Sequence, residues 1–239
     1  MYYLKAFETT EEYNKNGGLL VPSISLTEDD DLLHFETLPI VDLGLSSGTK
    51  WASMNIGAKS ETDYGLYFQW GDTVGYTGDE AKAHSTWSTC PGNGGNSFYN
   101  ITSLTAWNNE HLTNDILNTD VDAAHIHSNG RMKIPTREQC QELLNETNHS
   151  WVTNYNGTGI NGIKFVSKKD TSKYIFIPSS GHAFGGSFYN VSLKSRLWSS
   201  SVYTSNAQCA YYLGYSSDYY GVGGNSRSYG QCVRGIVNV

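Results

Sequence analysis

Residues Trp198 to Val239 read WSSSVYTSNAQCAYYLGYSSDYYGVGGNSRSYGQCVRGIVNV. Between Ser199 and Gly230 there is no Lys, Glu, Met or Trp, yet seven of the chain's seventeen tyrosines lie there. Leu, Val, Ile and Phe, which fill most protein cores, are scarce in this window. Tyr supplies rigid contact area and Ser, Gly and Asn supply adaptable hydrogen bonds, as in antibody paratopes. We therefore interpret the stretch as a displayed binding surface.

The amino acids of this window share a second property. All of them except Gln208 have codons that can be reached by changing the adenines of an Asn codon. Lys, Glu, Met and Trp cannot be reached in that way. The alternative interpretation is that strands and turns of a β-rich domain have this composition and that the tyrosines are half buried.

Length, charge and hydropathy narrow the class of protein. A chain of 239 residues is long enough for one large domain, or for a domain with a small appendage. The net charge of −7 and the lack of a basic run argue against nucleic-acid binding. The sequence has no run of eighteen apolar residues, so we predict that it does not insert into a membrane. The first residues, MYYLKAFETTEEY, lack a basic region followed by an apolar region, so we predict no signal peptide.

The four cysteines are Cys90, Cys140, Cys209 and Cys232. None belongs to a CxxC pair, which argues against a zinc ribbon or a thioredoxin-like site. Without a signal peptide, free thiols are expected. A Cys209–Cys232 bridge between neighbouring C-terminal strands is the alternative.

Residues 1–38 differ from the rest of the chain. MYYLKAF and LLVPSISL have the composition of short strands, and Gly17-Gly18 marks a turn between them. The acidic run 28–31 lacks the spaced oxygen ligands and the turn glycine of a calcium loop, so we interpret it as a solvated turn. We predict a small N-terminal β appendage over 1–38, which docks the main domain, 39–239, onto another body or onto copies of itself.

The main domain begins with apolar residues spaced as short strands joined by Ser-Ser-Gly and Gly-Ala turns, namely Leu43, Leu45, Trp51, Ile56, Tyr67 and Trp70. From 75 to about 130 the chain is polar and rich in Gly and Asn, which predicts long irregular segments. Residues 131–145 have the clearest helical pattern, with Thr136 as N-cap and Gln139 at the capping-box position. From Trp151 onward the pattern predicts strands separated by Gly, Asn or Ser turns.

Motifs for catalysis or metal binding are weak. Asp120, Asp122, His125 and His127 lie close together, and a His-x-His pair would place both imidazoles on one face of a strand. No third ligand follows at convincing spacing, so we predict no metal site. No GxSxG, P-loop, HExxH or GxGxxG is present, and the serines 199–201 have no neighbouring base. We therefore predict no enzymatic activity and no cofactor.

Five separated motifs occur together in one order: VDLGLSSGTKWASMNIGA, YGLYFQWGDT, DAAHIHSNGRMKIPTREQCQELL, IFIPSSGHAFGG and RLWSSSVY…AYYLGY…GQCVRGI. Over about residues 40–237 this order resembles the Bacteroidetes paralogous domain with a C-type lectin fold, akin to the formylglycine-generating-enzyme group. The resemblance implies an α+β protein: a C-type lectin fold with short antiparallel strands, few helices and long irregular loops.

Within that group, the C-terminal stretch resembles the variable region of diversity-generating retroelement proteins, in which reverse transcription errs at template adenines. The resemblance implies a variable region over about 198–235. Its implied fixed positions are Trp198, Ser199, Ser200, Ala210, Leu213, Tyr215, Val222, Arg227, Gly230, Val233 and Arg234. Its implied variable, ligand-binding positions are Val202, Thr204, Tyr212, Gly214, Ser216, Tyr219, Gly221, Gly223, Gly224, Asn225, Ser226, Ser228 and Tyr229.

Strand alternation predicts which of these positions are exposed, and two residues depart from the family pattern. Strand alternation places Tyr212, Gly214 and Ser216 outward and Leu213 and Tyr215 inward. We therefore expect the variable positions to be exposed on one face, while the fixed residues Trp198, Leu213, Tyr215 and Val233 are buried. Gln208 falls outside the variable set, and the usual Arg-Pro ending is Arg-Gly here.

The N-terminal segment is similar to the start of short phage or prophage proteins from gut Bacteroides. This implies a receptor-binding protein of a phage tail, located on the virion and used for host attachment. Its ligand would be a bacterial surface protein or glycan, and the N-terminal segment would contact the tail or other copies. The alternatives are a bacterial surface or pilus adhesin, and an enzyme of the formylglycine-generating type. That chemistry needs a close pair of redox-active cysteines, which Cys209 and Cys232 do not provide in the sequence.

Overall fold

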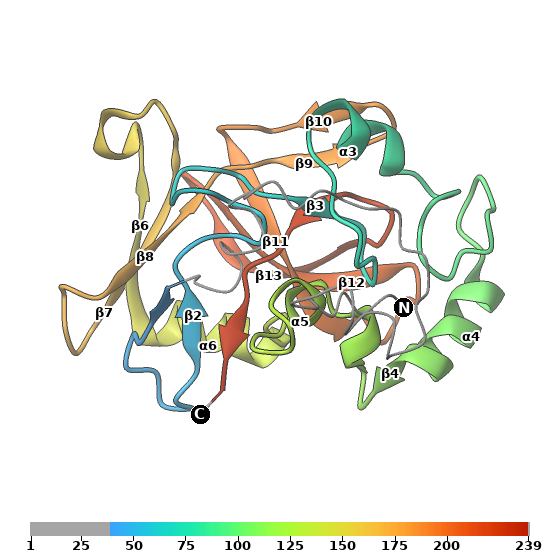
Figure 1. Cartoon of the computed structure of the whole chain (residues 1–239), viewed down its shortest axis with the longest axis horizontal. Helices are drawn as coiled ribbons and strands as arrows, with labels where there is room; N and C mark the ends of the chain where they lie inside the picture. Colours follow the sequence, from blue (N-terminus) through green and yellow to red (C-terminus); the bar gives the residue numbers. More distant parts are fainter. Residues whose placement is uncertain (1–38, 239) are drawn as a thin grey trace, which may run out of the picture. The chain divides into compact units, whose positions relative to one another are not determined.

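The computed structural model describes residues 39–238, all of which belong to one unit of the chain, Asp31–Val239. The predicted appendage over 1–38 lies outside the described residues. Strands outweigh helices, and nearly all strand pairs are antiparallel within small sheets, so the domain is of mixed α+β class (Figure 1). Within 39–238, no helix combines the length and the apolar character that crossing a bilayer requires.

The main sheet is built around one long strand near the C-terminus. Its order is β13-β12-β11-β14-β3, and the short strand β5 pairs with the end of β11. The bounds are β3 Tyr67–Phe68, β4 Leu112–Thr113, β5 Ile116–Leu117, β11 Lys194–Val202, β12 Cys209–Ser216, β13 Tyr220–Ser226 and β14 Gln231–Cys232. Leu197 pairs with Leu213 of β12 in antiparallel register and with Cys232 of β14 in parallel register. The stretch from Trp198 onward therefore supplies the second half of β11 and all of β12, β13 and β14.

Three smaller sheets complete the domain. β6, β7 and β8 form a meander, β1, β2 and β15 form a second sheet, and β9 with β10 forms a hairpin. The bounds are β1 Ile40–Val41, β2 Lys50–Ala52, β6 Thr147–Val152, β7 Gly162–Ser167, β8 Tyr174–Pro178, β9 His182–Phe184, β10 Ser187–Tyr189 and β15 Ile236–Val237. Ile236 pairs with Trp51, so the end of the described chain pairs with a strand close to its beginning.

The helix predicted over 131–145 is present as α6, Arg137–Glu146. Thr136 Oγ1 accepts from the Gln139 backbone N–H, and the Gln139 side chain accepts from the Thr136 N–H, which confirms the predicted capping box. Cys140, Leu143 and Leu144 form its buried stripe. Residues before Thr136 are not helical because Lys133 pairs with Ile236.

The prediction of irregular chain from 75 to 130 is wrong in part, because three helices lie there: α3 Gly78–His84, α4 Ile101–His111 and α5 Ala123–His127. In α4 only Leu104 is buried, so its sequence shows no apolar stripe. Its N-cap, Asn100, accepts a hydrogen bond from the Ser103 N–H. Short 3-10 turns, η1 Thr119–Val121 and η2 Tyr155–Gly157, complete the helical elements described.

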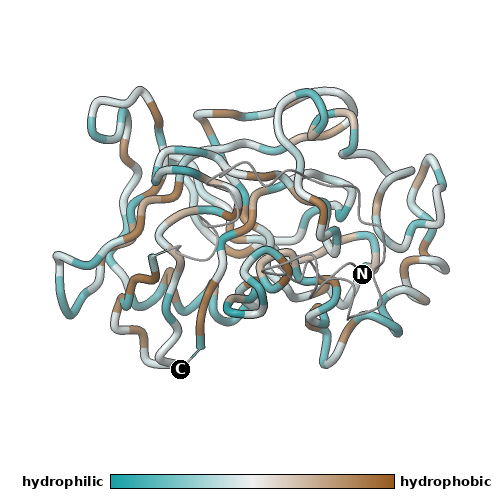
Figure 2. The backbone as a smooth tube through the Cα atoms, viewed as in Figure 1, coloured by the Kyte–Doolittle hydropathy of each residue, from teal (hydrophilic) through white to brown (hydrophobic). Residues whose placement is uncertain are grey.

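The main sheet separates two hydrophobic clusters. One contains Leu197, Leu213 and Tyr215 together with the stripe of α6. The other contains Trp198 and Val202 of β11. In Figure 2 the hydrophobic segments gather along the central strands, while the outer loops are mostly hydrophilic. The prediction of short early strands holds only for Trp51 and Tyr67, which lie on β2 and β3. Leu43, Leu45, Ile56 and Trp70 lie in loops and turns, although all six side chains are buried.

A buried arginine fastens the C-terminal strands. Arg234 is fully buried and donates to Asn55 Oδ1 at 2.8 Å, to the Ala52 carbonyl at 3.0 Å and to the Phe176 carbonyl at 3.1 Å. The Arg-Gly ending is followed by β15, so the chain continues into a paired strand at this point.

Candidate functional site

One side of β11, β12 and β13 carries the residues that are of most interest for binding. Arg196 lies opposite Gly214, and Gly214 lies opposite Gly221. Tyr212 lies two residues along β12, opposite Trp198 of β11 and Gly223 of β13. Side chains two residues apart on a strand share a face, so these positions lie together. We call this surface, defined by Arg196, Tyr212, Gly214, Gly221 and Gly223, the tyrosine face.

Glycines on the tyrosine face leave room for tyrosine rings to lie along the sheet. A Cβ atom at Gly214 would lie 2.5 Å from the Tyr212 ring, and one at Gly223 would lie 3.0 Å from the Tyr212 hydroxyl. A Cβ atom at Gly221 would lie 2.7 Å from the Tyr219 hydroxyl. Tyr212 and Tyr219 therefore lie on the same side of the sheet and extend over adjacent glycine positions.

An aromatic stack joins the β9–β10 hairpin to this surface. The His182 ring stacks on Tyr189 at 5.4 Å and on Tyr229 at 5.0 Å between centroids, and Phe184 lies 4.6 Å from Tyr229. Arg196 Nη1 donates to His182 Nδ1 at 3.4 Å, since arginine has no acceptor. The neutral His182 ring therefore carries its proton on Nε2.

Burial, and then the nearby charge of Arg196, lower the pKa of His182 to about 4. An unfolded chain has a His pKa near 6.5, so the unfolded state binds the proton first as the pH falls. The contribution of neutral His182 to the free energy of unfolding should therefore be fully present above about pH 6.5, and it should be lost as the pH falls toward 4. Between pH 7 and pH 4.5 the free energy of unfolding of the parent protein should fall by roughly 2 kcal/mol more than that of the His182→Gln variant. Urea titrations at several pH values measure this difference, and parallel pH profiles for the two proteins would contradict it.

The opposite side of these strands also carries tyrosines. Tyr203 lies 4.8 Å from Tyr211, and the Arg137 guanidinium of α6 lies 4.7 Å from the Tyr211 ring. Tyr220, which is 55% exposed, meets His149 edge-on at 4.2 Å. These three tyrosines were not among the predicted binding positions, although the codon pattern of the window includes them.

The exposure expected for the variable positions holds only in part. Thr204, Tyr219 and Gly224 are exposed, and a half-buried set consists of Tyr212, Gly221, Gly223, Asn225, Ser226 and Tyr229. The prediction is wrong for the buried set: Val202, Gly214, Ser216 and Ser228. The expected burial of the fixed residues is confirmed for Trp198, Leu213, Tyr215 and Val233.

Each buried exception has a local cause. Val202 packs in the second hydrophobic cluster because β11 is covered on both faces at that end. Gly214 lies beneath the Tyr212 ring. The Ser216 hydroxyl donates to Asp218 at 2.7 Å, and the Ser228 carbonyl accepts from the buried Gln69 side chain at 2.8 Å.

Tyr219 and Tyr229 differ in their surroundings, and we expect them to differ in their contribution to stability. Tyr219 is 50% exposed, so Tyr219→Ser should change the free energy of unfolding by less than about 1 kcal/mol. Tyr229 stacks on His182 and Phe184, so Tyr229→Ser should cost about 2 kcal/mol through lost aromatic packing. Denaturant titration of the two variants compares the same chemical change at both sites, and equal losses would contradict this difference.

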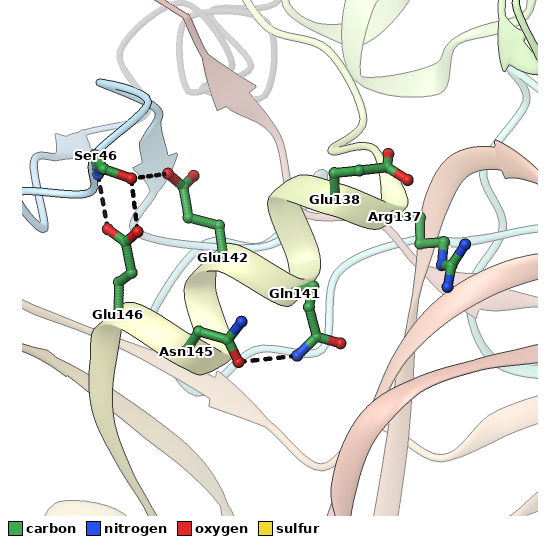
Figure 3. Close-up of a pocket in the computed structure, with 7 residues that line it drawn as sticks. All are labelled: Ser46, Arg137, Glu138, Gln141, Glu142, Asn145 and Glu146. Atoms are coloured by element: carbon green, nitrogen blue, oxygen red, sulfur yellow. Dashed lines mark hydrogen bonds between the residues drawn. The ribbon is translucent and has the colours of Figure 1, made fainter.

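The outer surface of α6 has a hollow of about 450 Å³ next to the loop at Ser46. Figure 3 shows that Glu142 and Glu146 point to Ser46, whereas Arg137 and Glu138 point elsewhere. Ser46 Oγ lies 2.6 Å from Glu146 Oε1, and the Ser46 N–H donates to Glu146 Oε2 at 2.7 Å. These carboxylates are therefore occupied in anchoring the loop.

A second hollow, of about 440 Å³, lies at the end of β11. Its walls come from α4, the β4–β5 turn and the loop after β11. Val202 and Thr204 line it, so two of the predicted binding positions border this hollow rather than the tyrosine face. Its lining is mainly amide and hydroxyl groups: Thr105, Asn108, Asn109, Leu112, Asn114, Asp115, Val202, Tyr203, Thr204 and Ala207.

All four cysteines are free thiols. β12 and β14 lie on opposite sides of β11, which rules out the alternative of a Cys209–Cys232 bridge. Burial raises the pKa of the Cys90 and Cys232 thiols to about 12 and also raises that of Cys140. A thiol must lose its proton to act as a nucleophile, so these three thiols are unreactive as nucleophiles at neutral pH.

The predicted Asp/His group is dispersed in the structure. His125 and His127 lie on the short helix α5, so the expected placement on one strand face is wrong. Asp122 caps that helix by accepting from the His125 N–H, and it also accepts from the Ile134 N–H. His127 Nε2 lies 3.0 Å from the Thr73 carbonyl. Among the side chains of 39–238, no three His, Cys, Asp or Glu residues come together as a metal site would require.

Comparison of the chain with protein-family models, with curated proteins and with solved structures finds no match.

Proposed function

We propose that this protein is a non-enzymatic binding module with a C-type lectin fold, and that the tyrosine face with Tyr219 and Tyr229 contacts its ligand. The observation that carries the proposal is the joint placement of Tyr212 and Tyr219 over the glycine positions of one sheet face. Tyr residues of this kind provide large contact areas with little side-chain entropy to lose. Exposed aromatic groups on one surface commonly mark an interaction site.

The fold assignment rests on the order of the five motifs and on the small antiparallel sheets around α6. In this proposal the C-terminal strands carry the variable region of a diversity-generating retroelement protein, and their backbone pairing holds a surface whose side chains change. The ligand is a bacterial surface protein or glycan, and the protein attaches a phage tail to its host. Sequencing the flanking DNA tests the genetic part: a near-copy of the segment encoding 198–235, with adenines at the variable codons and beside a reverse transcriptase gene, is expected.

Binding should depend on the tyrosines. Replacing all three of Tyr212, Tyr219 and Tyr229 by Ala should abolish binding to gut bacterial surface extracts. Truncating a tyrosine at an interface often weakens the binding free energy by about 2 kcal/mol or more. Multimeric protein should bind better than monomer because several weak contacts act together. Pull-down and surface plasmon resonance measure both effects.

The matched control is Phe98→Ala with Tyr99→Ala, in the Asn- and Gly-rich 90–100 loop, where the two side chains are 80% and 51% exposed. This variant should bind like the parent. Circular dichroism must first show that the triple variant is folded, because Tyr229 is half buried; Tyr219→Ala alone provides a variant with little effect on folding. Retained binding by the triple variant, with loss in the control, would move the ligand site to the 90–100 loop.

A second candidate is a bacterial surface or pilus adhesin that uses the same tyrosine face. Detection of the protein in purified phage particles by mass spectrometry supports the phage assignment. Its detection only in the bacterial envelope supports the adhesin.

A further inference from the structure

Arg196 is held in place but uses few of its hydrogen-bond donors. Its Nη1 donates to His182 Nδ1 at 3.4 Å, and its guanidinium lies 5.2 Å from the Tyr212 ring centroid. A guanidinium has five N–H donors. Among residues 39–238, no second acceptor lies within hydrogen-bond distance of Arg196 and no carboxylate lies within ion-pair distance of it.

The other two central arginines differ in this respect. Arg227 and Arg234 each donate to three acceptors and are fully buried. Arg196 is only half buried, so its remaining donors lie at the surface of the domain. Because His182 and Tyr212 already restrict the side chain, less entropy is lost when it binds a ligand.

Near Arg196 lie hydroxyl groups and charges of both signs. Lys194 lies two residues away on the same face of β11, and Asp218, near the end of β12, accepts from the Ser216 hydroxyl. The Tyr212 ring and the Tyr219 hydroxyl extend over Gly214 and Gly221, on the rung that also contains Arg196. The central strand of this rung, β12, pairs with β11 on one side and with β13 on the other, so a ligand that lies over β12 meets side chains.

We propose that Arg196, with the hydroxyls of Tyr212 and Tyr219, binds the carboxylate and the adjacent hydroxyls of an acidic sugar residue. The planar fork of an arginine matches the two oxygens of a carboxylate. Tyrosine hydroxyls both donate and accept, as sugar hydroxyls do, and the rings offer apolar surface to the sugar ring. An extended acidic peptide would instead pair with the main chain of the edge strand β13, and the triglutamate comparison below tests for that outcome. The inference rests on the proposed function, since it assigns a ligand class to the tyrosine face.

Arg196 and His182 precede the predicted variable region. Changes within that region would therefore alter the surroundings of the acidic sugar while the arginine stays the same.

The test is to titrate the full chain with small sugars and to measure binding by NMR and calorimetry. The probes are D-glucuronate, D-galacturonate and N-acetylneuraminate, with D-glucose, D-galactose, acetate and a triglutamate peptide as comparisons. At least one acidic sugar should bind about 10-fold more tightly than every comparison compound, as expected for one charge-assisted contact. Arg196→Gln should lose about 10-fold in affinity, and Arg196→Lys should recover part of it because the charge returns without the fork. Tyr219→Phe, which removes only a hydroxyl, should weaken binding by about 3-fold.

The matched control is Lys164→Gln, which removes another cation stacked on a tyrosine, Tyr174, at 3.7 Å. It should leave sugar binding unchanged. Unchanged affinity in a folded Arg196→Gln variant would overturn the inference, as would equal binding of the neutral sugars or of the triglutamate peptide. Absence of binding to all three acidic sugars would overturn it as well.

The two proposals can fail separately. Binding to bacteria that needs the tyrosines, but resists acidic sugars and Arg196→Gln, would overturn the sugar assignment alone. Binding to bacteria that survives the triple tyrosine change, together with Arg196-dependent binding of an acidic sugar, would overturn the proposed function alone.

Discussion

Trp198→Ala is expected to lower the free energy of unfolding by about 3–5 kcal/mol, the usual cost of truncating a core aromatic residue. Trp198 is 1% exposed, lies on the central strand β11 and packs in the second hydrophobic cluster. Its Nε1 donates to the Phe68 carbonyl at 2.8 Å, so truncation also leaves a buried acceptor without its donor. Urea unfolding followed by tryptophan fluorescence and circular dichroism measures the change.

Trp198→Phe separates packing from hydrogen bonding. It keeps an aromatic ring and loses the N–H group, so it should cost about 1–3 kcal/mol. Tyr219→Ser, on the exposed surface, is the control for general sensitivity to aromatic truncation. Losses of the same size at Trp198 and Tyr219 would show that the division into a buried scaffold and a changeable surface is wrong.

Arg227→Ala should have an effect of similar size, about 3–5 kcal/mol, because it combines a buried cavity with unpaired acceptors. Arg227 is fully buried, and its guanidinium lies 4.6 Å from the rings of both Trp70 and Trp107. It donates to Asn108 Oδ1 at 2.7 Å and, more weakly, to the carbonyls of Ala207 and Pro91. Burial lowers its pKa to about 10, so the side chain is still charged at neutral pH. Denaturant titration measures the loss.

Arg227→Lys should recover less than half of that loss, since a lysine keeps the charge but lacks the planar guanidinium that contacts both indoles. The control is Arg137→Ala, an exposed arginine that stacks on Tyr211 and should cost less than about 1 kcal/mol. If Arg227→Ala were no more costly than Arg137→Ala, the assigned role of the Trp70–Arg227–Trp107 stack in stability would be wrong.

Features that depend on local sequence were predictable. The capping box of α6 follows from Thr136 and Gln139, and the buried stripe of that helix follows from its apolar spacing. The burial of Trp51 and Trp70 follows from their size and their place between turn residues. Such signals act within a few residues, so they need no knowledge of the rest of the fold.

Features that depend on distant partners were not predictable. α4 buries a single residue, so no apolar stripe reveals it. The prediction that Val202 and Gly214 are exposed was wrong for two reasons. The main sheet is covered on both faces where Val202 lies, and the Tyr212 ring covers Gly214. Arg196 and His182 lie in two different motifs of the sequence and meet only because their strands come together in the fold, so neither motif alone reveals the contact.

The pairing of the last strands with early ones has a consequence for how the protein is made. β15 pairs with β2 and β14 pairs with β3, so each of these two early strands lacks one partner strand until residues 231–237 leave the ribosome. Contacts of such long sequence separation also slow folding. A stop codon anywhere in 198–235 would therefore release a chain without a closed core, and cellular proteases would remove it. Copies that stop before β14 and β15 should therefore not accumulate in the cell.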